Sequence, residues 1–185
     1  PHMADDSTTH ASTSEISGNA PEEVKELLAS ANYVPQANQP PTFADSIIKR
    51  TKTVEVSVVN KAEEPTRKEG RVVCEVLVEE DMTNGYGSVH GGCLALLIDQ
   101  CSTMALYALQ MSTVGEPFFG VSQSLNIVYH SPALLGDTLR IVNTTMTVGS
   151  RAVSVRAEVW SKTYHRLVAS GVHIKMQPSS EKAKL

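Results

Sequence analysis

Cysteine is scarce in this sequence, and the common metal-binding motifs are missing. The 185 residues include three cysteines, Cys74, Cys93 and Cys101, a small and odd number that is typical of a reducing compartment rather than of a disulfide framework. Cys93 and Cys101 are eight residues apart, about 12 Å along one helix, which is too far for a disulfide. No HExxH or CxxC spacing occurs and the six histidines are scattered, so we expect no metal site.

An excess of positive charge and a long apolar run are also lacking. The formal net charge is −4, which excludes the strongly basic surface typical of nucleic-acid-binding proteins. The longest apolar stretch, Cys93 to Ile98, is far shorter than the roughly 20 residues that a membrane-spanning helix needs. We therefore expect no nucleic-acid partner and no membrane span, and a cytoplasmic or mitochondrial location.

The first fifty residues differ in composition from the rest. Pro1-His2-Met3 resembles a remnant of cloning, and residues 1–20 are rich in Ser, Thr, Asp and Ala, so we expect a flexible tail there. Pro21-Glu22-Glu23 has the Pro and acidic residues of a helix start. A second short helix follows the proline-rich linker 35–42. Residues 21–50 are thus predicted to form an N-terminal helical extension.

Residues 51–177 carry the pattern of an α+β domain. Period-two alternation predicts two strands, then a helical stretch from Cys93 to about Gln110, then four more strands. The helical stretch is apolar on nearly all sides, which indicates a buried helix. We therefore predict a long central helix wrapped by a curved antiparallel sheet of about six strands, followed by a loose tail at 178–185.

Asp99 interrupts this apolar helix, between Ile98 and Gln100. A carboxylate at such a position loses water and needs partners. It can be a structural acid that caps a turn or pairs with a lysine. It can equally be a general base or nucleophile that faces a cleft. The residues alone leave both interpretations open.

His90-Gly91-Gly92 stands directly before the helix. Glycines let a ligand approach the backbone closely. The free N–H groups at a helix start suit an anion or a developing oxyanion. A tight turn that leads into a helix would have the same sequence, and the three residues by themselves favour that simpler interpretation.

The spacing of Gly91 and Asp99 predicts an obligate dimer. The two are eight residues apart, about 12 Å along one helix, and a carboxylate reaches only a few Å from its own backbone. If both serve one substrate, they come from two copies with antiparallel helices. A single curved sheet also leaves open edges, and pairing with a second copy is a usual remedy.

Three other kinds of residue are weaker candidates. Ser122 lies on a predicted strand without a G-x-S-x-G turn, which argues against a triad serine. Cys93 could be a nucleophile at a helix N-terminus, although such a cysteine is more often simply packed. We interpret His130, His165 and His173 as surface or strand-end residues.

Two runs of sequence resemble a known family. The run Thr83-Asn84-Gly85-Tyr86-Gly87-Ser88-Val89-His90-Gly91-Gly92, followed by Ile98-Asp99, and the later Gly120-Val121-Ser122 are similar to the hotdog-fold acyl-CoA thioesterases of the PaaI-like group. The likeness covers roughly residues 70–177. The combination of HGG, an Asp seven residues after its last Gly, and GVS is specific, whereas no single part would be.

The resemblance implies a role for each matching residue. Asp99 would activate the attacking water or attack directly, and the Gly91 N–H would polarise the thioester carbonyl. Asn84 and His90 would line the site and orient the substrate or the glycine loop, and Ser122 would help to place the water. The resemblance also implies sites at the subunit interface of a homodimer, assembled as a dimer of dimers.

The resemblance makes an acyl-CoA the substrate, with no cofactor beyond the CoA that the substrate carries. We expect Gly92 and four apolar residues to contact substrate, although each of the four could be plain core: Leu94, Leu97, Phe118 and Phe119. The extension of about fifty residues is longer than compact members of the family carry, and the loop at 60–70 is enlarged. Both features bear on specificity rather than on reaction type.

Two alternative functions are compatible with the same kind of fold. The first is another hotdog activity, an acyl-CoA hydratase or dehydratase, whose signature of a His with an Asp or Glu is not found. The second is a catalytically silent acyl-CoA-binding or scaffold protein, against which Asn84, His90, Asp99 and Ser122 argue.

Overall fold

The order of helices and strands follows the predicted pattern. The structure is a computed structural model that describes residues 15–31, 43–118 and 120–176. The elements are α1 (Glu22–Ala31), α2 (Asp45–Arg50), β1 (Lys52–Asn60), β2 (Lys68–Leu77), α3 (Gly91–Val114), β3 (Val121–Tyr129), β4 (Thr138–Val148), β5 (Ala152–Ser161) and β6 (Arg166–Met176). The predicted cloning remnant, the linker 35–42, Phe119 and the tail 178–185 lie outside the described residues.

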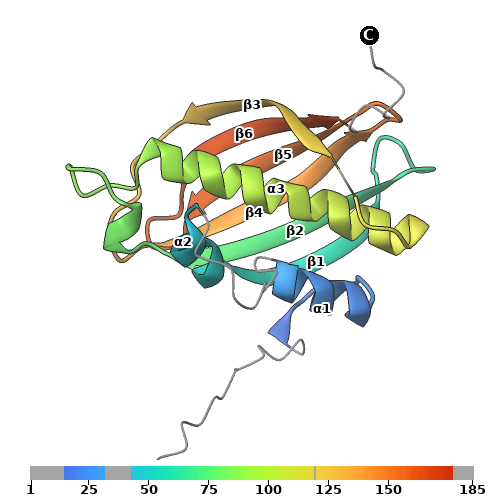
Figure 1. The fold of residues 1–185 in the computed structure, drawn as a ribbon, viewed down its shortest axis with the longest axis horizontal. Coiled ribbons are helices and arrows are strands. Elements are labelled where there is room, and N and C mark those ends of the chain that lie inside the picture. Colours follow the sequence, from blue (N-terminus) through green and yellow to red (C-terminus); the bar gives the residue numbers. More distant parts are fainter. Residues whose placement is uncertain (1–14, 32–42, 119, 177–185) are drawn as a thin grey trace, which may run out of the picture.

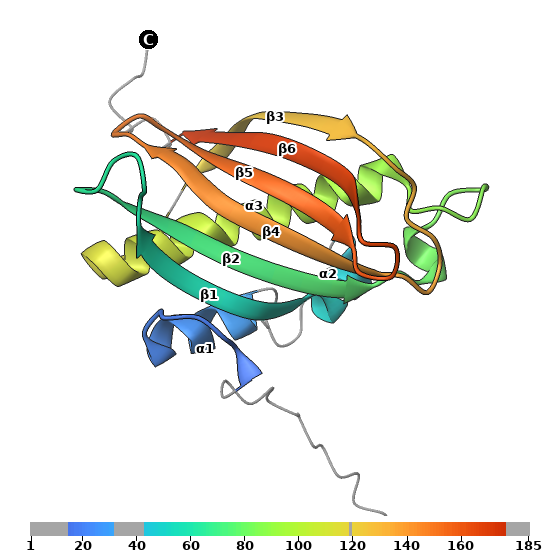
Figure 2. The ribbon, with the colours of Figure 1, turned by 180° about the vertical axis from the view of Figure 1, so that it is seen from behind.

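All six strands form one antiparallel sheet in the order β1-β2-β4-β5-β6-β3. The long helix α3 crosses one face of this sheet, and the strands curve around it (Figures 1 and 2). The predicted fold class is therefore confirmed, and the arrangement is the hotdog fold.

Helix α3 has well-defined ends. His90 caps its N-terminus. At the C-terminus, Gly115 adopts a left-handed conformation (φ 81°), and its N–H donates to the carbonyls of Gln110 and Met111. The helix has 24 residues, longer than the stretch to Gln110 that was predicted. By length and composition it could also cross a membrane, but such helices are weak evidence because a core helix meets the same test. Most of it is enclosed by the sheet.

The core lies between α3 and the sheet. Gly70 on β2 permits the closest approach, because a Cβ there would lie 2.4 Å from the carbonyl oxygen of Ala105. Fully buried side chains come from both layers, including Val56, Val72, Val76, Ile98, Leu139, Ile141 and Val155. α1 adds Val24 and Leu28 to the same cluster.

Residues 15–20 do not continue the flexible tail that their composition predicts. Ser17 pairs with β1 through two backbone hydrogen bonds, to Val54 and from Val56. The Asn19 side chain bonds both the N–H and the carbonyl of Val58. Ile16 is buried, at 8% exposure. This segment covers the outer edge of β1 because it satisfies backbone groups that β1 would otherwise leave open.

The opposite edge, β3, has no such cover from the residues that the structure describes. Among the described strands it pairs with β6 alone. Val121, Val128 and Tyr129 are 53–55% exposed. The sheet thus has one shielded edge and one open, partly apolar edge.

Candidate active site

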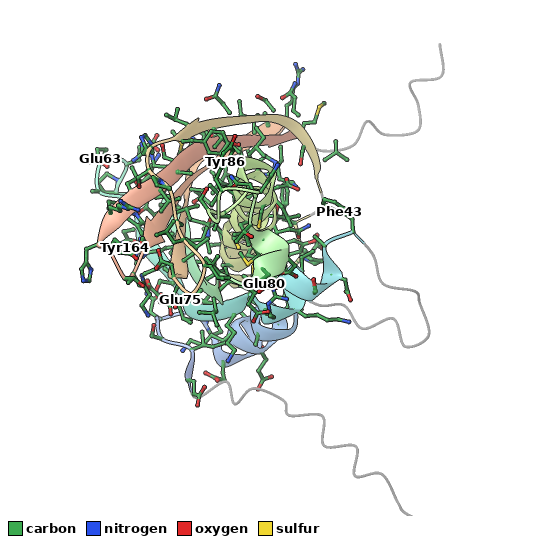
Figure 3. The ribbon with its side chains drawn as sticks, turned by 90° about the vertical axis from the view of Figure 1, so that its left-hand side faces the viewer. Phe43, Glu63, Glu75, Glu80, Tyr86 and Tyr164 are labelled. Atoms are coloured by element: carbon green, nitrogen blue, oxygen red, sulfur yellow. The ribbon has the colours of Figure 1, made fainter. Side chains whose placement is uncertain are left out.

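The Gly-rich turn before α3 is organised by Asn84. Its side-chain oxygen accepts hydrogen bonds from the N–H of Tyr86 (2.9 Å) and from the hydroxyl of Ser88 (3.3 Å). The side-chain amide nitrogen of Asn84 makes no hydrogen bond to any described residue. Tyr86, 95% exposed, projects from the tip of this turn, at the end of the molecule that faces the viewer in Figure 3. The predicted site residue Asn84 therefore has donor capacity left for a ligand.

His90 leaves one backbone donor free at the start of α3. Its Nδ1 accepts the N–H of Gly92 at 2.9 Å, and its carbonyl accepts the N–H groups of Cys93 and Leu94. The N–H of Gly91 has no partner within the described part of the chain. A Cβ on Gly92 would lie 3.0 Å from the His90 ring, so glycine at 92 permits the cap. The result is a single unpaired N–H at the positive end of a long helix dipole.

Asp99 faces β3 rather than the closed core. Its side chain is 39% exposed, which corrects the expectation that a carboxylate in this helix has lost its water. Ser122 of β3 donates a hydrogen bond to Asp99 Oδ1 at 3.2 Å. The two residues were predicted to act together, and the fold brings them into contact because β3 passes over this face of α3.

His173 contacts the candidate site residues, which the sequence analysis did not predict. It was interpreted as a surface or strand-end residue, but it is 0% exposed. Its Nε2 lies 2.9 Å from Ser122 Oγ and 3.3 Å from Asp99 Oδ1. Its Nδ1 lies 2.7 Å from Ser102 Oγ. His173 therefore connects α3 and β3 behind the candidate acid.

A signal for His173 was present in the neighbouring strand. On β5, Val153 and Val155 face the helix, and both are buried. Their partners across the β5–β6 pair are Lys175 and His173. Opposite residues in an antiparallel pair share a face. The register therefore places His173 and Lys175 on the face toward the helix. The sequence alone suggests the reverse, because Val172 and Ile174 are the apolar residues of this stretch.

The geometry indicates which nitrogen of His173 carries the proton. A bare nitrogen lone pair 3.3 Å from a carboxylate oxygen would be repelled, so the proton belongs on Nε2, and Nδ1 accepts from Ser102. Burial lowers the pKa of His173 below 6.5; the charge of Asp99 opposes this effect and that of Lys175 adds to it. At neutral pH His173 is a neutral donor toward Ser122 and Asp99.

One chain does not bring the acid and the backbone donor together. Gly91 and Asp99 both lie on α3, about 12 Å apart along its axis. The polar groups around Asp99 come from α3, β3 and β6, and those around Gly91 come from the preceding turn and the end of β3. The chain presents two half-sites, one at the start of α3 and one near its middle.

Comparison with known proteins identifies the family of this chain. The family model described as thioesterase superfamily matches residues 86–167. A human protein named acyl-coenzyme A thioesterase 13 is 40% identical over 106 residues, which are 57% of this chain and 72% of that protein. The chain belongs to the thioesterase superfamily.

Solved structures of other proteins share the fold. Zebrafish thioesterase superfamily member 2 aligns with a TM-score of 0.59 and 32% identity over 76% of this chain and 89% of its own. The PaaI protein from the phenylacetic acid degradation operon of E. coli aligns with a TM-score of 0.52 over 60% of this chain and 74% of its own. At 22% identity, the latter likeness concerns the fold alone.

Two cavities of this superfamily member adjoin predicted substrate contacts. A cavity of about 360 Å³ next to the first half-site is lined by Gly91, Leu94 and Tyr129, among others. A second one, of about 690 Å³, at the far end of α3 is lined by Phe118 and Leu109. Leu97 is 2% exposed and belongs to the core cluster. Gly92 is exposed at the helix start.

The cysteines of this superfamily member do not form a reactive centre. Burial raises the pKa of the Cys93 thiol to about 11, with a smaller contribution from Asp81, which argues against a thiolate nucleophile. A hydrogen bond with Cys74, together with burial, raises the Cys101 pKa well above its usual range. In the part of the chain that the structure describes, no three His, Cys, Asp or Glu residues gather as metal ligands would.

Proposed function

We propose that this chain hydrolyses acyl-CoA thioesters to a free acid and CoA, in a homodimer whose two sites each combine Asp99 of one subunit with the Gly91 N–H of the other. The observation that carries the proposal is the pair of groups on α3: the free Gly91 N–H at its start, and Asp99 near its middle, which accepts a hydrogen bond from Ser122 of the open strand β3. The likeness to proteins named acyl-coenzyme A thioesterase 13 supports the reaction class.

The proposed reaction uses each half-site for one task. The thioester carbonyl oxygen accepts the Gly91 N–H and the amide of Asn84, which stabilise the oxyanion as it forms. A water bound by Ser122 gives a proton to Asp99 while its oxygen adds to the carbonyl carbon. The carbon–sulfur bond then breaks as the carbonyl forms again, and the departing thiolate takes up a proton, which balances the one that Asp99 returns to the solvent. His90 keeps Nε2 free to donate toward that sulfur, because its Nδ1 accepts from Gly92.

In this proposal His173 positions Ser122 and Asp99. Its neutral Nε2–H supplies a donor to both side chains, and Ser102 fixes the ring from the other side. Buried polar groups that are fully bonded hold a site rigid. Ser122 and Asp99 therefore keep a constant separation for the attacking water.

The open edge of β3 supports the dimer. An uncovered strand with exposed Val121, Val128 and Tyr129 is suited to pairing with a second copy. Such pairing would set the two α3 helices antiparallel and bring each Asp99 toward the partner's half-site. A dimer of dimers remains a further proposal.

We also propose water as the only co-substrate, with no cofactor or metal. The cavity beside Gly91 and Leu94 is the proposed start of the acyl site, and the cytoplasm or mitochondrion is the proposed compartment.

Subunit mixing with two variants tests the composite site. Gly91→Pro removes the N–H but suits the first position of a helix, and the extended His90 (φ −64°, ψ 135°) is compatible with a following proline. Asp99→Asn removes the base. Each variant alone should lose about 100-fold or more in kcat. An equal mixture, refolded together, should recover about one quarter of wild-type activity, because half the dimers are mixed and each has one intact site.

Gly91→Ala is the matched control. It keeps the N–H, and its Cβ would lie 3.4 Å from the Tyr129 ring, so its loss of kcat should be far smaller than that of Gly91→Pro. A mixture no more active than its components would refute the shared site. Wild-type protein that binds acyl-CoA without releasing thiol would instead favour the silent-binder alternative, and hydration of an enoyl-CoA would favour the hydratase.

A further inference from the structure

Lys175 is an unusual residue for its place in the fold. It lies on β6, on the face that packs against α3, and is only 7% exposed. Its neighbours across the two strand pairs are Val153 on β5 and Ser122 on β3. A buried ammonium group costs stability unless it is paired. A lysine at this position therefore needs a partner of opposite charge or a functional reason.

The Lys175 side chain is held beside the candidate acid. Its Nζ donates a hydrogen bond to Thr103 Oγ1 at 3.1 Å. The same Thr103 hydroxyl donates to the backbone carbonyl of Asp99 at 2.9 Å. Lys175 thus reaches the turn of α3 that carries Asp99, and Thr103 fixes its position there.

Lys175 is the cation available to the Asp99 carboxylate. Ser122 of β3 and His173 of β6 contact the carboxylate of Asp99, and Ser102 and Thr103 of α3 bond its backbone carbonyl. Lys175 of β6 lies near enough for its charge and that of Asp99 to influence each other. His173 is neutral at pH 7 because burial lowers its pKa. Burial also lowers the pKa of Lys175, and the nearby Asp99 charge opposes that shift. Within the described ranges, no lysine or arginine forms a direct ion pair with Asp99, so Lys175 acts on it through space, from its anchor on Thr103.

We propose that Lys175 is a positioning residue of the hydrolytic reaction, whose ammonium group, anchored by Thr103, keeps the Asp99 carboxylate charged in the closed site. The inference rests on the proposed function. A second subunit over β3 would remove water from the Asp99 side chain, which is 39% exposed in the single chain, and would favour its uncharged form. A fixed positive charge nearby offsets that effect, so Asp99 can still accept a proton from water near neutral pH.

The test is the pH dependence of kcat/KM with an acyl-CoA substrate. In Lys175→Met the acid limb should move to higher pH by about one unit, because losing a nearby positive charge makes a carboxyl group harder to ionise. Lys175→Arg should restore the wild-type limb. Thr103→Val, which leaves the lysine but removes its anchor, should move the limb in the same direction by less. Lys162→Met, on the hairpin away from the site and paired with Glu75, is the matched control and should leave the limb in place.

The outcomes separate this inference from the proposed function. An acid limb that stays unmoved in folded Lys175→Met, with or without a change in thermal stability, refutes the role of Lys175. If the wild type releases no thiol from acyl-CoA, the proposed function fails instead. The ¹³C shift of the Asp99 carboxyl group, followed against pH in wild type and Lys175→Met, then still reports on Lys175: identical curves overturn the inference and displaced curves support it. If Lys175→Met does not fold, Lys175→Gln replaces it in both measurements.

Discussion

The two edges of the sheet differ in how they end. At β1, residues 16–20 form backbone and side-chain hydrogen bonds with the strand, and α1 buries Val24 and Leu28 beside it. At β3, the described chain offers nothing beyond the strand itself, whose side chains are mostly exposed. A separate segment of the chain thus covers the β1 edge, whereas the β3 edge stays open in the described structure.

The two sides of the sheet also differ in the side chains that they present to the helix. The strand next to β1 is β2, which presents apolar side chains such as Val72 and Val76 to the helix. The strand next to β3 is β6, which presents His173 and Lys175 at equivalent depth. An imidazole and an ammonium group are expensive to bury. Their presence on β6, beside the open edge, is expected if a second subunit completes a site there.

The largest expected effect comes from placing a charge on the open edge. Val128→Lys puts a lysine on β3 at a side chain that is 53% exposed, and edge lysines oppose strand pairing. We expect a shift from dimer to monomer in analytical ultracentrifugation. Thiol release should fall about 100-fold or more, because a monomer loses the oxyanion donor of its partner.

The same substitution on the covered edge is the control. Val59 of β1 is 37% exposed, and Val59→Lys should change neither the mass in solution nor the activity. If both variants stay dimeric and active, or both fail, the functional distinction between the edges is incorrect.

A smaller effect concerns the buried histidine of β6. The folded chain resists protonation of His173, since burial lowers its pKa, whereas the unfolded chain takes up a proton near the ordinary pKa of 6.5. The free energy of unfolding should therefore fall as pH drops below about 6.5. His173→Gln should make this fall shallower in urea unfolding between pH 5 and 7.

His165→Asn provides the comparison for that measurement. His165 is exposed in the β5–β6 hairpin with a positive φ of 51°, which asparagine tolerates. This variant should keep the wild-type pH slope. An equally steep slope in His173→Gln would contradict the assignment of the acid sensitivity to His173.

The smallest effect is expected at the covered edge. Asn19→Ala removes two hydrogen bonds to Val58 and should cost about 1 kcal/mol of unfolding free energy, a fall of about 3 °C in Tm. The measurement is differential scanning calorimetry together with kcat/KM. Activity should be unchanged at a temperature where both proteins are folded, and a marked loss of turnover would connect this edge to the site after all.

The fold was predictable because its burial pattern is local. Short runs with strand-like alternation predicted all six strands, and a stretch with apolar residues on nearly all sides of a helix predicted α3. The start of α3 was predicted at Cys93, two residues after its true start at Gly91, because Gly91-Gly92 suit a turn as well as a capped helix. Residues 15–20 were assigned to the tail because composition cannot report a pairing with β1 forty residues away.

The candidate site could be proposed from the sequence where a motif placed its residues close together. Asn84, His90, Gly91 and Asp99 lie within sixteen residues, and Ser122 was identified by resemblance. His173 and Lys175 were missed because their place depends on the register with β5. The exposure of Asp99 was also misjudged, because one chain leaves the β3 side of α3 uncovered.

The register at the end of the sheet has a practical consequence. Met176, the last described residue of β6, lies opposite Val121, the first residue of β3, while Ser17 sits against β1 on the far side. A bulky fusion joined close behind Met176 would crowd the open edge. One joined ahead of residue 15 would project from the shielded edge. Immobilisation on a sensor surface should therefore use the N-terminal side.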